Sequence, residues 1–245
     1  SNDPGGLTST EARENPRAAS SRNVAFDAGE ALDQQKLGAS FKHTLANGDV
    51  ITARNYYVFR NSQNRLPFTD GGTVTFDRFF AGGGLSYSRS FQLGAYQHRL
   101  IVGVDYDRQD DDRQRYDNLA GVQGPLTFDQ TERATSTGVF LQDELRLSDA
   151  LAVTIGLRYD TVDFDVSDSF LVDGDDSGTR SIDDISPSVG FVYRLNDQHN
   201  LYGSFATAFE TPTFTEFVNP DGSGGFNPEL APQLSTSVEL GLRGS

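Results

Sequence analysis

The sequence predicts an all-β fold, a transmembrane antiparallel up-and-down β-barrel that is present in part, as about nine strands. Its clearest strand covers 151–160, where large apolar residues occupy the odd positions and small or polar residues the even ones. A repeat of two gives a strand one apolar and one polar face. The joint 148–150 connects it to a similar preceding arm, so 134–166 forms an antiparallel hairpin. Each arm is about twice the usual strand length, which is typical of a barrel wall.

The order of the connections also favours a barrel. Outer-membrane barrels have short turns on the periplasmic side and long loops outside, whereas soluble sandwiches have no reason to keep long loops at one end. We therefore expect odd-numbered strands to run toward the periplasm and even-numbered strands away from it. The predicted connections alternate between short and long: 47–48, 62–72, 91–95, 110–132, 148–150, 167–183, 196–199 and 211–232.

The elements follow one another from an initial loop. Residues 1–29 are rich in Gly, Pro, Asn and Ser without a sustained period, which predicts a long extracellular loop. Asn47-Gly48 predicts a type I′ turn, because both residues tolerate positive φ. Asp110–Glu132 and Ser167–Asp183 read as acidic loops. Strands are expected at about 30–45, 49–61, 73–90, 96–109, 134–147, 151–166, 184–195, 200–210 and 233–243.

Aromatic residues are expected to form two girdles at the membrane surfaces. Tyr87 and Tyr193 would lie near the inner rim, and Phe59, Tyr106 and Tyr159 near the outer rim. An odd number of strands leaves an unpaired edge, which a membrane does not tolerate. We therefore expect the chain to be a fragment of a larger barrel.

Composition excludes several classes of function. The absence of Cys removes disulfides, thiol catalysis and thiolate metal sites. A net charge of -15 leaves no basic surface for nucleic acid. No apolar stretch has the length of a membrane-spanning helix, and none has the pattern of a signal peptide. The chain has no Met, so residue 1 is not a translation start, and we expect a mature protein or an excised piece.

Two alternatives from other classes remain open at this point. A soluble or surface-exposed β-sandwich could act as a binding module, and it would place the apolar strand faces against a second sheet. A barrel enzyme of the lipase type would need a nucleophile, and the sequence contains no nucleophile elbow. We therefore expect no enzyme and no catalytic residues.

Several segments resemble the barrel strands of TonB-dependent outer-membrane receptors. The stretch 205–244 is the most specific part, and Asp3–Thr8 with Phe26–Glu30 is similar to iron-transport members in particular. The resemblance covers most of the chain. The similar segments are 140–149 with 155–160, 187–191 with 201–212, and 226–230 with 237–244.

The resemblance implies a 22-stranded barrel with an N-terminal plug domain, of which this sequence lacks the plug, the TonB-contacting segment and the closing strands. Residues 1–245 would be a portion of the barrel domain, with 1–29 as an extracellular loop and 30–245 as strands and loops. The implied role is import of ferric siderophores through the outer membrane of a Gram-negative bacterium. Another cargo, such as a cobalamin, a carbohydrate or a different metal complex, is the alternative within the family.

The implied partners are outer-membrane lipid, a small-molecule iron chelate and the TonB complex, the last through the plug domain. Nucleic acid is not expected. Haem receptors of this family typically place a histidine in the segment that matches 211–230, and this sequence has none there, which argues against haem as cargo.

Ligand-binding candidates are residues that face the lumen near the outer rim, because cargo enters there. Strand parity gives Arg60 and Arg78, with Tyr56 and Phe80 as further candidates. Guanidinium groups suit an anionic, carboxylate-bearing chelate through charge-assisted bidentate hydrogen bonds. The alternative is that these arginines only pair with Asp105 or Asp107 across the barrel wall.

A calcium site is a weaker candidate. Asp173, Asp175, Ser177 and Asp184 imitate the spacing of an EF-hand loop. Arg180 falls where an apolar residue is usual, and the flanks resemble strands, so a solvated extracellular loop is favoured instead. His43, His98 and His199 have no ligand spacing, and we expect no other metal and no cofactor.

Overall fold

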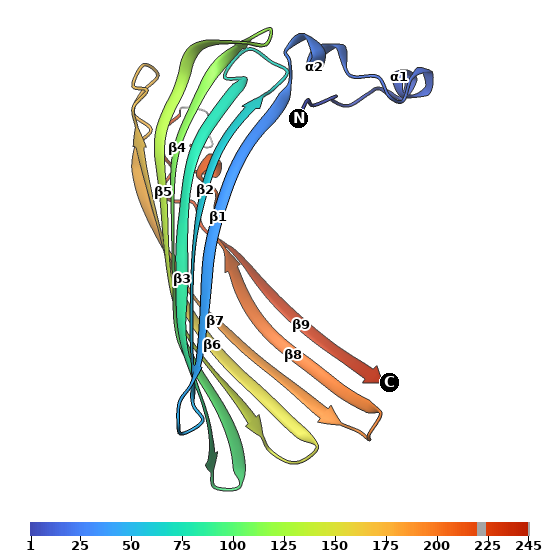
Figure 1. The fold of residues 1–245 in the computed structure, drawn as a ribbon, viewed down its shortest axis with the longest axis vertical. Coiled ribbons are helices and arrows are strands. Elements are labelled where there is room, and N and C mark those ends of the chain that lie inside the picture. Colours follow the sequence, from blue (N-terminus) through green and yellow to red (C-terminus); the bar gives the residue numbers. More distant parts are fainter. Residues whose placement is uncertain (220–223, 245) are drawn as a thin grey trace.

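The computed structural model describes residues 1–219 and 224–244, and in these ranges nine strands form one antiparallel sheet (Figure 1). Each strand pairs with its neighbours in chain order, from β1 to β9, which confirms the up-and-down topology. The strands are β1 (Gly29–Thr44), β2 (Val50–Arg65), β3 (Thr73–Leu93), β4 (Tyr96–Leu119), β5 (Val122–Arg146), β6 (Leu151–Asp168), β7 (Gly178–Arg194), β8 (His199–Glu210) and β9 (Gln233–Gly244). Three short helices are α1 (Ser9–Glu14), α2 (Ser21–Ala25) and η1 (Phe214–Glu216).

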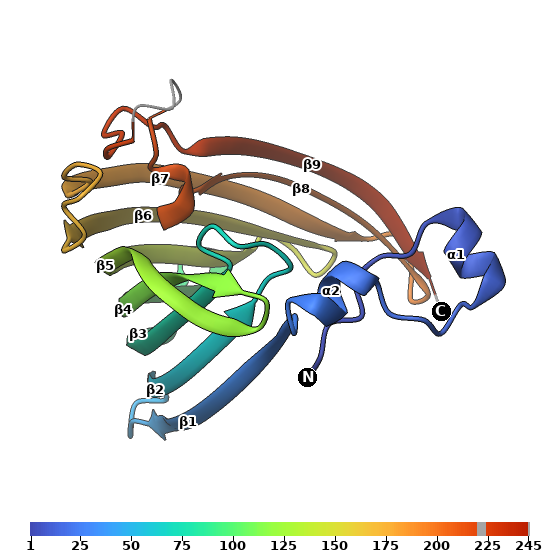
Figure 2. The ribbon, with the colours of Figure 1, turned by 90° about the horizontal axis from the view of Figure 1, so that it is seen from above.

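The sheet is curved and open, with β1 and β9 as its two edges. Seen from above, the strands follow an arc from β1 to β9, and η1 lies on the inner side of that arc (Figure 2). The shape is that of a barrel wall rather than of two stacked sheets. The sandwich alternative is therefore wrong for the described part of the chain.

The outward face is apolar and exposed. Residues paired directly across neighbouring strands share a face, and the register aligns Tyr57 with Leu37 and Ala81. Leu37 is 73% exposed and Val238 is 76% exposed, so this face has no protein cover among the described residues. Such a band is what a lipid-facing barrel wall requires. Further exposed apolar residues are Phe41, Leu85, Val104, Val139, Leu141, Ile155, Leu157, Val189, Phe205, Leu240 and Leu242.

The aromatic residues expected in the two girdles lie on this outward face. Phe59, Tyr106, Tyr159 and Tyr193 are exposed there. Tyr87 donates a hydrogen bond to the carboxylate of Asp49, near the short turn between β1 and β2. No helix within 1–219 and 224–244 is long and apolar enough to cross a membrane.

The buried apolar cluster is small and lies on the other, inner face. Phe164 of β6 and Ile182 of β7 pack against Phe217, which follows η1 in the long connection 211–232 between β8 and β9. The ring of Phe164 also makes an edge-to-face contact with Phe214 at a centroid distance of 5.5 Å. This connection therefore folds inward over the upper part of the wall rather than projecting freely. Its residues 220–223 lie outside the described ranges.

Two predicted acidic loops are wrong in extent. The segment 110–132 is not a loop, because β4 and β5 continue through it to a tight turn at Ala120-Gly121 with φ of 53° and 91°. Likewise, β6 and β7 shorten the second loop to 169–177. Above the lipid band both faces of a strand meet water, so the apolar alternation that reveals a strand disappears there.

The turn at Asn47-Gly48 joins β1 and β2 as expected, but its type is different. Gly48 has a φ of 87°, while Asn47 is not among the residues with positive φ. The amide of Gly48 donates to Leu45 and that of Leu45 donates to Asp49, which describes a three-residue hairpin loop with a glycine in the left-handed conformation. The type I′ prediction was therefore wrong.

The segment before β1 is more ordered than the loop predicted for 1–29. It contains α1 and α2, and β1 already begins at Gly29. Asn118 at the end of β4 is fully buried, and its Nδ2 donates to the carbonyls of Phe26 and Leu66, each at 2.9 Å. Its Oδ1 accepts from the amide of Gly121 at 2.7 Å. One side chain thus ties together three connections at the outer end. That 1–29 is extracellular stays a prediction.

Candidate functional site

The polar face of the sheet lines the inside of the arc. Phe164 shares this face with Arg158 and Asp160 by its position on β6, and it contacts Phe214 of η1. Since η1 lies inside the arc (Figure 2), these side chains point toward the lumen. The lumenal face carries two groups of charged residues at different heights.

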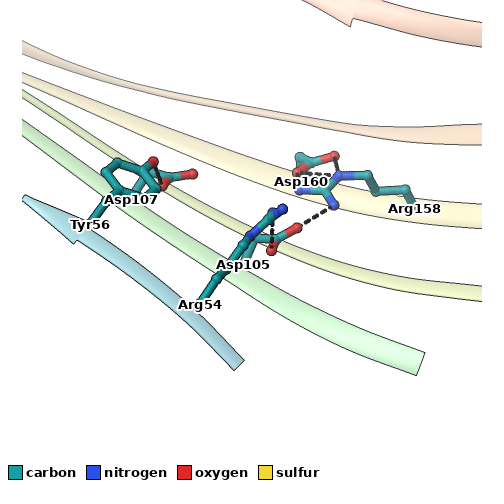
Figure 3. Close-up of polar contacts among 6 residues, drawn as sticks. All are labelled: Arg54, Tyr56, Asp105, Asp107, Arg158 and Asp160. Carbon is teal, nitrogen blue, oxygen red and sulfur yellow. Dashed lines mark hydrogen bonds and ion pairs between the residues drawn. The ribbon is translucent and has the colours of Figure 1, made fainter. Parts of the chain in front are cut away.

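The mid-lumen network joins three strands (Figure 3). Nη2 of Arg54 donates to Oδ1 of Asp105 at 2.9 Å, and Nη1 of Arg158 donates to Oδ2 of the same carboxylate at 2.8 Å. Nε of Arg158 also donates to both oxygens of Asp160, at 2.9 and 2.8 Å. Nearby, the hydroxyl of Tyr56 donates to Asp107. The carboxylate of Asp105 is therefore held between two guanidinium groups, while that of Asp160 pairs with Arg158 alone.

Glycines make this network possible. Gly84 lies between Arg54 and Asp105 in the register, and Gly138 lies between Asp105 and Asp160. A Cβ atom at Gly84 would lie 2.2 Å from Oδ1 of Asp105. A Cβ atom at Gly138 would lie 2.1 Å from Nη2 of Arg158. The side chains can thus meet across an intervening strand only because that strand has none at this point.

The outer-lumen pocket lies higher, under the connection 211–232. Arg78 donates from Nε and Nη2 to the two oxygens of Asp111, at 2.7 and 2.5 Å. Nη1 of Arg113 donates to Glu132 at 3.1 Å, and the Glu132 side chain is 4% exposed. The pocket has a volume of about 450 Å³. Its aromatic and roof residues are Phe76, Phe164, Pro212, Thr213, Phe214 and Thr215.

The four predicted ligand residues form two neighbouring pairs and do not share one pocket. Arg60 and Arg78 are directly paired across β2 and β3, but Arg60 donates from Nε and Nη2 to the uncharged Oε1 of Gln34. The rings of Tyr56, four positions before Arg60, and Phe80, two positions after Arg78, are in contact, with their centroids 5.4 Å apart. Arg78 lines the outer-lumen pocket, whereas the other three candidates do not.

The alternative pairing predicted for these arginines was wrong in its partners. Arg78 pairs with Asp111, and Arg60 makes no ion pair with any described residue. Asp105 instead accepts from arginines on β2 and β6. Which carboxylate an arginine meets depends on the register between strands, and the sequence does not show that register directly.

Six charged residues of these two groups were not predicted from the sequence: Arg54, Asp111, Arg113, Glu132, Arg158 and Asp160. For Arg54 a signal was present, because it has the same strand parity as Arg60. Arg113 and Glu132 were not predicted because the segment 110–132 was assigned to a loop, and strand parity does not apply to a loop.

The residues of the weak calcium candidate do not converge. Asp173, Asp175 and Ser177 lie in the loop between β6 and β7, while Asp184 lies in β7, paired with Asp160. Oδ1 of Asp175 accepts from the amide of Ser177 at 3.0 Å, and hydrogen bonds from that residue lower the pKa of Asp175. Among the described residues, no three His, Asp or Glu side chains are grouped to hold a metal ion.

Comparison with known families and proteins gives a consistent result. Residues 1–245 match the family described as "TonB dependent receptor-like, beta-barrel". The vitamin B12 transporter BtuB of Vibrio vulnificus is 29% identical over 148 residues, which cover 58% of this chain and 19% of that protein. The ferrioxamine B receptor of Salmonella typhimurium is 24% identical over 234 residues, covering 86% and 32%. The chain thus spans about a fifth to a third of the length of these relatives.

Solved structures share the fold. The ferric citrate transporter FecA in its unliganded form aligns with a TM-score of 0.83 at 17% identity, covering 98% of this chain and 36% of that one. The alcaligin outer-membrane receptor FauA of Bordetella pertussis aligns with a TM-score of 0.67 at 19% identity, covering 88% and 35%. The curved sheet of nine strands therefore has the same fold as these structures, and the chain spans 35–36% of the length of each.

Proposed function

Because the chain belongs to the TonB-dependent receptor β-barrel family, we propose that it forms part of the wall of a receptor that imports a ferric siderophore. The family consists of transport receptors of the Gram-negative outer membrane and not of enzymes. In this proposal the exposed apolar face contacts outer-membrane lipid, and energy for uptake reaches the receptor from the TonB complex through a plug domain in the barrel.

The outer-lumen pocket supports an iron chelate as cargo. It combines aromatic rings with the edges of two guanidinium groups, and it is covered by the connection that carries η1. The charges of Arg78 and Arg113 are compensated by Asp111 and Glu132, so these arginines offer hydrogen bonds without much free charge. A chelate with apolar linkers and polar metal-binding groups matches this lining.

Arg60 adds an uncompensated positive charge beside the pocket. Its side-chain nitrogens Nε and Nη2 donate to the uncharged amide of Gln34, and it stands opposite Arg78 in the register. An anionic group on the cargo would therefore gain more from Arg60 than from Arg78. A charge-assisted hydrogen bond contributes about 1.5–3 kcal/mol, or about a tenfold to hundredfold change in affinity.

Uptake measurements on the full-length receptor test this proposal. The receptor would be expressed in a Gram-negative strain without other ferric-chelate receptors and given ⁵⁵Fe-labelled ferrioxamine B or ferric citrate. We expect uptake of at least one chelate, with the half-saturating concentration raised about tenfold or more by Arg60→Gln. Arg99→Gln, at the opposite end of the lumen beside Glu144, serves as the control. Absence of uptake of either chelate by the wild-type receptor would count against iron as cargo.

Cobalamin is the second candidate cargo. The observation that favours it is the similarity to the vitamin B12 transporter of Vibrio vulnificus, at 29% identity over 148 residues. Labelled cyanocobalamin given to the same strain decides between the two. Uptake of cyanocobalamin without uptake of either iron chelate would replace the siderophore proposal while keeping the barrel and its lumen.

A further inference from the structure

A second lumenal pocket lies beneath the outer one. It has a volume of about 370 Å³, and its lining includes Arg54, Asp105 and Arg158 together with Phe140, leucines and small polar residues. Arg54 pairs with Gly84 in the register, six positions along β3 from Arg78, which corresponds to about 20 Å at the usual rise of a strand. The two pockets are thus separate sites on one wall. The small polar lining residues include Thr52, Ser86, Ser186 and Ser188.

The two arginines of this mid-lumen pocket differ in how many of their donors are used. Arg158 donates from Nη1 to Asp105 and from Nε to Asp160, and Nη2 lies 2.7 Å from Asp160. Arg54 donates only from Nη2, to Asp105. Within residues 1–219 and 224–244, its Nε and Nη1 have no acceptor, and its side chain is 63% exposed. Arg54 is therefore held in place by one hydrogen bond and keeps a free donor edge toward the lumen.

The charges of the pocket favour a ligand with a single negative charge. Its lining contributes two guanidinium groups and one carboxylate, a net charge of +1. Asp160, which does not line the pocket, forms an ion pair with Arg158 and compensates part of that positive charge. A dianion such as phosphate would be only partly compensated here, whereas a carboxylate matches both the charge and the planar geometry of a guanidinium edge.

We propose that the mid-lumen pocket is a carboxylate-binding site in which Arg54 is the anchoring residue. The hydroxyl groups of Ser86 and Ser188 also line the pocket and offer further hydrogen-bond partners there. A Cβ atom at Gly156 would lie 2.6 Å from Oγ of Ser188, so this glycine leaves room for that hydroxyl at the pocket wall. The carboxylate can belong to a solute in the lumen or to another part of the protein. This inference does not depend on the identity of the imported cargo.

The test uses the full-length receptor in detergent and ¹⁹F NMR of 4-fluorobenzoate, with the uncharged 4-fluorobenzamide as the reference compound. We expect the receptor to broaden the signal of the benzoate and not that of the amide. Arg54→Gln should weaken binding at least tenfold, and Arg54→Lys should weaken it less, because the charge remains. Arg99→Gln is the matched control: Arg99 is 55% exposed, pairs with one carboxylate, and lies outside the pocket.

The two sources of the carboxylate give different results. If a carboxylate of the protein occupies the pocket, the benzoate does not bind the wild-type receptor, and Arg54→Gln lowers the midpoint of thermal unfolding by several degrees more than Arg99→Gln. If the benzoate binds equally to wild type and Arg54→Gln, the proposal is wrong. It is equally wrong if the benzoate does not bind and the two variants unfold alike.

Discussion

Nδ2 of Asn118 donates a hydrogen bond of 2.9 Å to the backbone carbonyl of Phe26, across 92 positions of sequence. This contact fastens the segment before β1 to the end of β4. The same amide group serves Leu66 in the connection between β2 and β3. The outer end of the wall is therefore organised around one buried polar side chain. Each of its hydrogen bonds replaces one that a backbone group would otherwise make with water.

Replacing Asn118 should release this outer end without unfolding the strands. Asn118→Ala leaves two carbonyls and one amide without their partner, and we expect the local free energy of opening to fall by about 2–3 kcal/mol. Hydrogen exchange of residues 23–30 should then be about 30–150 times faster. Asn61→Ala is the control, because its amide bonds to Asp77 at an exposed position. Unchanged exchange in Asn118→Ala would show that the segment is held by other contacts.

The glycine between Arg54 and Asp105 gives a second prediction. Gly84→Ala places a Cβ 2.2 Å from Oδ1 of Asp105, so the carboxylate must move and its contact with Arg54 is strained. We expect a loss of about 1–3 kcal/mol in unfolding free energy, measured as a lower midpoint of thermal unfolding in detergent. Gly190→Ala is matched, since its Cβ would meet its nearest neighbour at 3.6 Å. Equal midpoints for the two variants would contradict the close-approach argument.

The buried ion pair of Arg113 and Glu132 gives a third prediction. Arg113→Leu leaves a carboxylate that is 4% exposed without its partner, and we expect a destabilisation of about 3–5 kcal/mol in urea-induced unfolding. The double variant Arg113→Leu with Glu132→Leu removes both charges and should recover most of that loss. A double variant as unstable as the single one would show that the pair contributes more than charge compensation.

The short helix η1 should respond to pH through Glu216. The backbone amide and the hydroxyl of Thr213 donate to its carboxylate, and these bonds lower the pKa of Glu216 below the ordinary value of 4.5. A carboxyl group whose pKa is lower in the folded than in the unfolded state contributes stability at pH values above its unfolded-state pKa. This contribution is lost as the pH falls through its folded-state pKa. Exchange of the Thr213 amide, corrected for its intrinsic rate, should therefore accelerate below about pH 4.5.

Glu216→Gln should remove that pH dependence, because the amide oxygen still accepts but does not titrate. Glu229→Gln, in the same connection, should leave it in place, since Glu229 caps no helix among the described residues. A Thr213 amide whose exchange is equally pH-dependent in wild type and Glu216→Gln would rule out this carboxyl as the cause.

Parity along the strands was sufficient to predict the two faces of the sheet. The alternation in 151–160 places Ile155 and Leu157 on the exposed outward face and Arg158 in the lumen, where the structure has them. It also placed Arg60 and Arg78 on one face. The alternation did not predict the strands in 110–132, because water on both sides of the sheet removes the apolar face there. In that segment the strands are recognised from the continued backbone pairing of β4 with β5.

The sequence by itself determined the family resemblance, the nine strands, their up-and-down order and which side of each strand is apolar, because a repeat of two is a local property. Only the tertiary structure decided that Asp105 lies between Arg54 and Arg158 and that Asp111 accepts from Arg78. Those pairs join residues 33 to 53 positions apart. Their meeting depends on strand register and on glycines in the strands between them, and a shift of one residue would turn every such side chain to the opposite face.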